Sequence, residues 1–334
     1  LQPYESAILG SINLSNHVTR ESSGHDPFID WEKLKITIHT AVHFLDNATD
    51  INEFHLPEIA QRVRKTRKLG LGVMGFADML INLRIAYNSS EAFNTADQVM
   101  QFIDNEARKA SCKLAKTRGV FPYFEESILK NYGEEFHTRN ATRTTISPTG
   151  TLSIIASCSP SIEPLFALSY LRKTAQFEML EVNPLFEEVA KEEGFYSEDL
   201  LRKIALSGTL KDIDEVPNHI KEIFVTAMDL SPETHVAMQA AFQKHVDAAV
   251  SKTVNFPYSA TVEDVKKVFE LAYDLGCKGI TIYRDGSRTM QVLTSFKREY
   301  VKEQKNEPKD EDKETFVYSS NNAPTIHKKL HTFR

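Results

Sequence analysis

Residues 139–156, with the sequence RNATRTTISPTGTLSIIA, form the stretch from which the fold of this chain is most readily inferred. Threonines and branched residues before Pro148 are typical of a strand, the Pro-Thr-Gly triplet predicts a tight turn, and the apolar run after it predicts a helix. Such a turn directs unpaired backbone N–H groups into one small space, next to the hydroxyls of Thr149, Thr151 and Ser153. The residues alone leave two interpretations open: an anion pocket, or an ordinary strand-to-helix turn capped by threonine or serine.

Bulk composition narrows the classes of protein to which the chain can belong. Its 334 residues carry a net charge of −6 at pH 7 and a pI near 6.0. This balance argues against an extended basic surface and predicts no nucleic-acid partner, so any phosphate recognition must be local. No apolar run approaches the length of a membrane span and no signal peptide is visible, so we expect a cytoplasmic protein without a membrane partner. The length permits two modest domains or one large α/β domain.

Cysteine and histidine spacing predicts neither disulfides nor a metal centre. Cys112, Cys158 and Cys277 lie far apart with no CxxC pair, which is typical of reduced thiols. His39 and His43 have the i, i+4 spacing that can suit a metal on a helix. No HExxH motif or carboxylate partner accompanies them in the sequence, and we therefore expect no metal site.

Hydrophobic periodicity predicts an alternation of helices and strands. The expected helices lie within residues 30–69, with a second one around 58–65, and at 89–119, 183–193, 198–206, 216–229, 232–250 and 261–276. The expected strands lie at 8–14, 251–257 and 279–283, beside the one before Pro148. Residues 69–79, LGLGVMGFADM, contain half of a dinucleotide fingerprint but lack the preceding strand and the acidic residue of that motif. We expect a glycine-mediated helix packing there instead.

The stretch at 139–156 is similar, almost residue for residue, to the phosphate-binding turn of the adenosylcobalamin-dependent (class II) ribonucleotide reductases. Further segments resemble successive segments of that family in the same order across residues 1–293: LQPYESAILGSINLS, KLGLGVMGFADMLINLRIAYNS, SPSIEPLFALSY, VSKTVNFP and LGCKGITIYRDGSR. The resemblance implies an α/β fold, namely the second, C-terminal half of a ten-stranded α/β barrel of the ribonucleotide reductase / glycyl radical enzyme type. It also implies a part in reducing ribonucleotides to deoxyribonucleotides through a cysteine thiyl radical.

The resemblance assigns roles to individual positions. Substrate phosphates are expected on the turn residues Ser147, Pro148, Thr149, Gly150, Thr151, Leu152 and Ser153. No catalytic residue is expected in this chain, because the family's radical cysteine lies in an Asn-Pro-Cys-Gly-Glu loop upstream of the segment that begins at Leu1. Ala7 stands where the family usually has one of its two reducing cysteines, so that thiol chemistry cannot occur here.

Cofactor and partners also follow from the resemblance. Adenosylcobalamin is the implied cofactor, with no residue assigned to contact it. The Thr-Ile-Tyr sequence at 281–283 lacks the adjacent tyrosine pair of class I reductases, which favours a radical generated by cobalamin. The expected partners are a ribonucleoside di- or triphosphate, the missing N-terminal half of the barrel and, for the whole enzyme, a thioredoxin-like dithiol reductant. Leu1 falls in the middle of a motif, so we expect a cut there rather than a natural start.

We expect a half-barrel over residues 1–293 and a flexible tail over 294–334, which is dense in both charges and poor in branched apolar residues. The absence of cysteine from this tail, together with Ala7, leaves an alternative function open: a non-catalytic or degenerate reductase-like partner protein. An unrelated phosphate-binding α/β enzyme would require the collinear resemblance to be accidental.

Several side chains near the turn have two interpretations. Glu163 is either a buried hydrogen-bond anchor for backbone groups or a direct contact to substrate, and the first is favoured. Lys252 and Asn255 either face the site or brace its loop. Cys158, without a neighbouring cysteine, is more typical of a small core residue than of a redox thiol. The basic residues of the 62–68 segment are predicted to form a solvated helix face: Arg62, Arg64, Lys65, Arg67 and Lys68.

Overall fold

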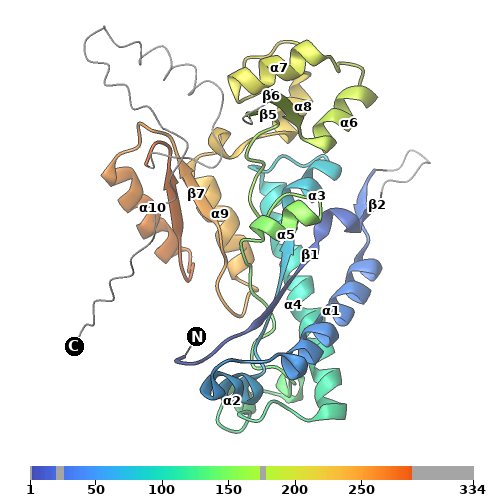
Figure 1. Ribbon diagram of the computed structural model, residues 1–334, viewed down its shortest axis with the longest axis vertical. Coiled ribbons are helices and arrows are strands. Elements are labelled where there is room, and N and C mark those ends of the chain that lie inside the picture. Colours follow the sequence, from blue (N-terminus) through green and yellow to red (C-terminus); the bar gives the residue numbers. More distant parts are fainter. Residues whose placement is uncertain (1, 20–25, 174–177, 288–334) are drawn as a thin grey trace, which may run out of the picture.

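The computed structural model describes residues 2–19, 26–173 and 178–287, in which short parallel strands are flanked by helices (Figure 1). The elements in chain order are β1 (Ile8–Asn13), η1 (Leu14–His17), β2 (Val18–Thr19), β3 (Phe28–Ile29), α1 (Trp31–Ile51), α2 (Pro57–Thr66), β4 (Leu69–Met74), α3 (Phe76–Asn82), α4 (Ser90–Arg118), η2 (Ile128–Asn131), η3 (Glu134–Phe136), α5 (Gly150–Ile155), β5 (Ser169–Lys173), β6 (Glu178–Val182), α6 (Pro184–Glu192), α7 (Glu198–Ser207), α8 (Asn218–Ile223), η4 (Ala227–Asp229), α9 (Pro232–Gln243), β7 (Thr253–Phe256), α10 (Val262–Asp274) and β8 (Thr281–Arg284).

The stretch before the turn lies at the centre of the parallel strands. β1 pairs in parallel with β4, and β7 pairs in parallel with β8. Isolated parallel bridges join β4 to Thr144, and Ile146 to Val250. The strands therefore follow one another as β1, β4, the 144–146 segment, the chain that enters β7, and β8. The predicted strand before Pro148 is present as an extended segment held by one bridge on each side.

Two long helices, α1 and α4, pack against each other, and α1 also covers β1 and β4 (Figure 1). Asp30 accepts a hydrogen bond from the N–H of Lys33 and caps α1, while Ser89 caps α4 in the same way. The predicted apolar face of α4 is buried at Ala96, Val99, Ile103, Ala107 and Ala110. This helix ends at Gly119, as the sequence predicts.

The prediction for residues 69–79 is wrong. They form the strand β4 and the start of α3, not a glycine-mediated helix packing. A Cβ atom at Gly72 would lie 2.3 Å from the carbonyl oxygen of Thr145, and one at Gly70 would lie 2.5 Å from Thr145 Cγ2. Glycine therefore allows the 144–146 segment to approach β4 closely. The glycines also hide the apolar pattern by which a short buried strand is recognised in sequence.

The C-terminal unit β7–α10–β8 follows the prediction closely. Thr261 and Asp264 form the expected capping box at the start of α10. Side chains from α10, β7 and α9 form a small apolar core: Val236, Val254, Phe256, Val268 and Ala272. The last strand begins at Thr281, two positions after the predicted start at Gly279.

Two predicted helices are shorter in the structure. α9 begins with the predicted Ser231 cap and ends at Gln243 instead of continuing to residue 250. The Gln243 amide donates to the carbonyl of Ala248 at 3.0 Å, in the loop that leads back to Val250. The helix predicted for 216–229 is divided into α8 and η4. The helices predicted at 183–193 and 198–206 are confirmed, whereas the β5–β6 hairpin was not predicted.

The basic residues at 62–68 do not all lie on a solvated face, and for Arg67 the prediction is wrong. Arg67 is buried, with a φ of 47°, and its guanidinium reaches Asp46 at 2.8 Å and Asp50 at 2.6 Å. Asn140 and Arg118 donate to the Asp46 carboxylate at 2.9 Å and 3.1 Å. We name this group the Asp46 cluster. It ties α1 to the end of α4 and to the starts of the central strands. The predicted tail at 294–334 lies outside the described residues.

Candidate phosphate-binding site

The turn at residues 147–150 carries the chain from the 144–146 segment into α5, which lies beside β1 (Figure 1). Thr149 occupies the left-handed region with a φ of 50°, and α5 begins at Gly150, one residue before the expected start. No side chain in the described part of the chain caps this helix. The N–H groups of Gly150, Thr151 and Leu152 lack helical acceptors, as in the first turn of any helix. They are the donors that the turn can offer to an anion.

Two of the three hydroxyls expected beside these N–H groups serve the turn itself. Thr149 Oγ1 accepts a hydrogen bond from the N–H of Ser161 at 2.7 Å. Ser153 Oγ donates to the carbonyl of Gly150 at 3.0 Å. Thr149 and Ser153 are both buried, whereas Thr151 is exposed. Thr149 and Ser153 therefore hold the shape of the turn, and Thr151 is open to a ligand.

The remaining residues of the turn connect it to β1 and to solvent. Ser147 Oγ lies 3.4 Å from Ser11 Oγ of β1. Pro148 and Gly150 are exposed, and a Cβ atom at Gly150 would meet no heavy atom within 4 Å. Leu152 is 41% exposed. The turn thus has one side fixed against β1 and one side open.

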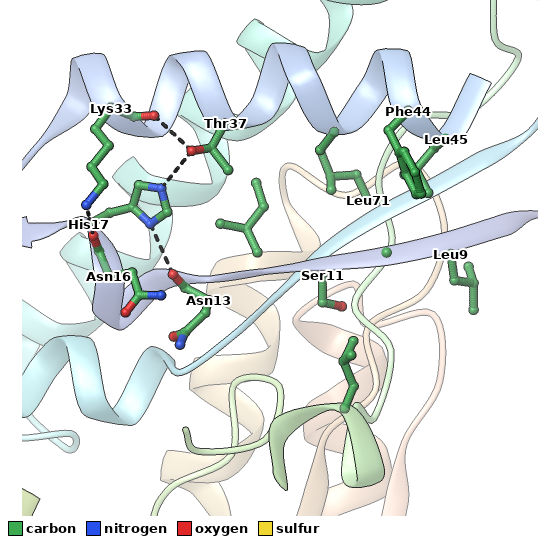
Figure 2. A pocket seen from close by; sticks show the side chains of 14 residues that line it. Leu9, Ser11, Asn13, Asn16, His17, Lys33, Thr37, Phe44, Leu45 and Leu71 are labelled. Carbon is green, nitrogen blue, oxygen red and sulfur yellow. Dashed lines mark hydrogen bonds between the residues drawn. The ribbon is translucent and has the colours of Figure 1, made fainter. Parts of the chain in front are cut away.

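A groove of about 740 Å³ runs along the edge of β1 that no described strand pairs with. Figure 2 shows α1 on one side of this groove and β1 on the other. At its polar end, His17 contacts the Asn13 carbonyl and the Thr37 hydroxyl, both at 3.0 Å. At its other end Leu9 and Phe44 are exposed. An unpaired strand edge beside exposed apolar side chains is a typical site for the packing of a further strand.

A buried ion pair holds the loop that follows α5. Glu163 Oε2 accepts a hydrogen bond from Lys252 Nζ at 2.5 Å, and its Oε1 accepts one from the N–H of Thr253 at 2.7 Å. The same ammonium group donates to His235 Nδ1 at 2.8 Å. Nε2 of this imidazole lies 3.1 Å from the carbonyl of Ala227. We name Glu163, Lys252 and His235, with these backbone contacts, the Glu163 latch.

Burial lowers the pKa values of both basic side chains of the Glu163 latch, His235 and Lys252. Desolvation, and next the charge of Lys252, lower the pKa of His235 to about 3, so its ring is neutral. A neutral ring that accepts from Lys252 at Nδ1 carries its proton on Nε2 and donates to Ala227. Desolvation also lowers the pKa of Lys252, while the carboxylate of Glu163 acts in the opposite direction.

The contacts of the Glu163 latch decide between the two interpretations left open for Glu163 and for Lys252. Glu163 binds a backbone N–H, so its interpretation as a hydrogen-bond anchor is confirmed. Lys252 is fully buried and braces the loop. Asn255 is half-buried, and its role stays a prediction. Sequence reasoning did not single out His235, because it is one of several polar residues in α9 and no local pattern sets it apart.

The three cysteines are free thiols. Burial, and next the charge of Asp78, raise the pKa of Cys158 to about 11. Burial also raises the pKa of Cys112 and of Cys277. All three are therefore protonated at neutral pH and are weak nucleophiles.

The two histidines with i, i+4 spacing have different partners. His39 Nε2 lies 2.9 Å from the carboxylate of Glu106, and Nε2 of His43 accepts a hydrogen bond from Arg118 at 3.0 Å. Over residues 2–19, 26–173 and 178–287, no group of three or more His, Cys, Asp or Glu side chains is arranged to hold a metal ion.

A family model described as "Ribonucleotide reductase, barrel domain" matches residues 2–283. The chain belongs to this family. The chain is 50% identical over 308 residues to the vitamin B12-dependent ribonucleoside-diphosphate reductase of Thermoplasma acidophilum, covering 92% of this chain and 39% of that protein. It is 43% identical over 295 residues to a Mycobacterium tuberculosis protein of the same name, covering 88% and 41%. The chain thus spans about two fifths of the length of these relatives.

A solved structure confirms the expected fold. The alpha subunit of a class Id ribonucleotide reductase from Actinobacillus ureae matches with a TM-score of 0.68 and 24% identity, covering 83% of this chain and 49% of that one. The expectation of a reductase α/β barrel is therefore confirmed. Among the helices described for this reductase barrel, none is both long and apolar enough to span a membrane.

Proposed function

We propose that this chain is the substrate-binding part of an adenosylcobalamin-dependent ribonucleoside diphosphate reductase, which makes deoxyribonucleotides by thiyl-radical chemistry. The observation that carries the proposal is 50% identity, over 92% of this chain, to a vitamin B12-dependent ribonucleoside-diphosphate reductase. The diphosphate is the favoured substrate because the B12-dependent relatives at 50% and 43% identity carry that name.

In this proposal the backbone N–H groups of Gly150, Thr151 and Leu152 hold the substrate phosphates. Ser147, Pro148, Thr149 and Ser153 give the turn its shape. The uncapped start of α5 and the exposure of Gly150 and Thr151 support this role. The overall charge of −6 also fits recognition of phosphate by a local arrangement of dipoles.

Adenosylcobalamin, when bound, supplies the radical through homolysis of its Co–C bond. The residues near the open side of the turn fit a large, partly apolar cofactor, because Leu152, Ile154 and Ile155 of α5 are all substantially exposed. The part of this chain in the reaction is to bind and orient the nucleotide, which favours the reacting geometry. The radical cysteine is supplied by another part of the reductase.

The remaining half of the barrel is the proposed protein partner. The groove along β1 and its exposed apolar rim support this proposal, because a barrel strand placed there would pair with β1 and cover the rim. Ala7 directly precedes β1, so one of the two reducing thiols of the family is missing at this edge. We propose a thioredoxin-like dithiol as the external reductant of the whole enzyme.

Ala7 also favours a second candidate function, a degenerate reductase-like partner that binds nucleotide without turnover. The two functions differ in the product formed once the barrel is complete. Deoxynucleotide formation by the complete barrel with Ala7→Cys supports the enzyme, whereas nucleotide binding without any product in that variant supports the degenerate partner.

Gly150→Val tests the proposed phosphate site. The new side chain has room in the folded protein, since a Cβ atom there meets nothing within 4 Å. It would nevertheless crowd a phosphate on the adjacent N–H groups. We expect KM for CDP to rise about tenfold with little change in kcat, because phosphate contacts are similar in the ground and transition states.

Gly279→Val is the matched control for this experiment. Gly279 is also exposed, a Cβ atom there also meets nothing within 4 Å, and the residue lies just before β8 instead of in the turn. Both variants are assayed in the complete reductase that carries Ala7→Cys, which turnover requires. An unchanged KM in Gly150→Val, or the same rise in both variants, would remove the phosphate-site assignment.

A further inference from the structure

The loop after α5 is held in a conformation that non-glycine residues seldom adopt. Ser157 and Ser161 both have a positive φ, at 51° and 50°. Left-handed backbone costs about 1–2 kcal/mol per residue for ordinary side chains. Ser161 is also completely buried, and its N–H donates to the hydroxyl of Thr149. The conformation of the turn is therefore coupled to a strained loop that other contacts must hold in place.

The contacts that hold this loop lie within two residues of Ser161. Tyr87, which is buried, donates its hydroxyl to the carbonyl of Ile162. Glu163 then joins the loop to Lys252 through its Oε2 atom and to Thr253 through its Oε1 atom. Lys252 has no exposed side-chain surface, whereas Glu163 keeps 19% of its own. A charge-assisted bond to a fully buried ammonium has little freedom to shift.

We propose that Glu163 is a positioning residue for the phosphate-binding turn. Its carboxylate fixes the loop on the start of β7, which keeps the Ser161 N–H on the Thr149 hydroxyl. The backbone of Thr149 thereby stays in the left-handed region, and the first N–H groups of α5 stay directed at one point. This inference rests on the proposed function and adds to it the residue that sets the geometry of the site.

The Asp46 cluster provides the matched comparison. Asp46, like Glu163, is a carboxylate that binds a buried cation and a further hydrogen-bond donor. Asp46 however joins helices to the first residues of the strands, and it makes no contact with the turn or its loop. Changing each carboxylate to its amide removes one negative charge from a buried pair at each end of the strands.

The experiment measures the dissociation constants of cytidine and of CDP for the complete reductase, by calorimetry at one pH, in the wild type, Glu163→Gln and Asp46→Asn. The ratio of the two constants isolates the contribution of the phosphates. We expect Glu163→Gln to reduce this ratio about tenfold, which corresponds to the loss of one charge-assisted contact. Asp46→Asn should lower the melting temperature and leave the ratio unchanged.

Each outcome supports or overturns a defined statement. If the wild type binds CDP no more tightly than cytidine, the phosphate site of the proposed function fails, and the positioning role fails with it. If the wild type prefers CDP and Glu163→Gln keeps that preference, only the positioning role is overturned. An equal loss in both variants would also overturn it, because the effect would then follow general destabilisation.

A second variant covers the case in which Glu163→Gln does not fold. Glu163→Gln with Lys252→Met removes the unpaired ammonium, so the interior no longer contains a charge without a partner. The Thr253 N–H retains an acceptor in the glutamine carbonyl. Because the ion pair is gone, we expect the same reduction in the ratio of dissociation constants. A ratio equal to that of the wild type would overturn the proposal.

Discussion

The Asp46 cluster and the Glu163 latch are both buried ionic groups, but they lie at opposite ends of the parallel strands. The Asp46 cluster includes Asn140, which precedes the central strand segment, whereas the latch holds the loop that follows the turn. The first joins α1 and α4 to the strand starts, and the second joins two loops to the start of β7. Buried pairs of a carboxylate and a cation therefore join helices to strands at one end of the strands, and hold the loop of a candidate site at the other.

The largest loss of stability is expected from a change in the Asp46 cluster. Asp46→Ala leaves Arg67 and Asn140 buried without their shared acceptor. Removal of one partner from a buried pair costs about 3–5 kcal/mol, and we expect a loss of this size in the unfolding free energy. Chemical denaturation of the complete reductase measures it. A loss below about 1 kcal/mol, which is the range of a surface ion pair, would show that the Asp46 cluster does not stabilise the fold as a buried pair does.

The latch should make stability depend on pH. The pKa of His235 falls from 6.5 to about 3 on burial, so between these values the unfolded chain binds a proton that the folded chain does not. The stability that comes from keeping this ring neutral is fully present above pH 6.5 and is lost as the pH falls toward 3. The unfolding free energy changes with a slope of at most about 1.4 kcal/mol per pH unit. Unfolding free energies of the wild type and His235→Gln between pH 7 and pH 5 measure it. Equal slopes in both proteins would contradict the neutral buried ring.

A smaller effect is expected at the second anchor of the strained loop. Tyr87→Phe removes the hydroxyl that donates to the Ile162 carbonyl and leaves this carbonyl buried without that donor. We expect a loss of about 1–3 kcal/mol in stability, together with a modest rise in KM for CDP when turnover is measured in the complete reductase that carries Ala7→Cys. Tyr123→Phe is the control, because the Tyr123 ring packs against Arg62 and Lys65 of α2. A stability loss without any change in KM would separate Tyr87 from the site and leave the latch as its main support.

The smallest effect is expected from the cysteines. Cys112, Cys158 and Cys277 are free thiols whose raised pKa values keep them protonated at neutral pH, so we expect no reducing pair among them. In the complete reductase that carries Ala7→Cys, serine or alanine at each position should leave dithiol-dependent turnover unchanged apart from small effects on stability. Turnover assays on the three single variants test this. Loss of turnover in Cys158→Ala with folding preserved would show that a reducing thiol does lie at the turn.

The features that sequence predicted are those encoded locally. The turn at Thr149, the cap of α10 at Thr261 and the apolar face of α4 each depend on residues a few positions apart. β4 was missed because Gly70 and Gly72 serve a close approach to a segment more than 70 positions later.

In the candidate site, too, contacts between residues far apart in the chain could not be predicted from the sequence. The turn itself was recognised from its own residues, but the partner of Glu163 lies 89 positions away. The burial of Arg67 likewise depends on Asp46, 21 positions earlier, and on the docking of two helices. Periodicity reports which face of an element is buried, and it carries no information on which polar groups meet inside the fold.

The most direct test of the account is deoxynucleotide formation from CDP with adenosylcobalamin and a dithiol. We predict no product from this chain alone, and nucleotide binding without product once the remaining half of the barrel is added. Product should then require Ala7→Cys, because two thiols must be oxidised to a disulfide to reduce one ribonucleotide and Ala7 removes one of them. Product from this chain alone would contradict the account, and so would a completed Ala7→Cys barrel that binds CDP but forms none.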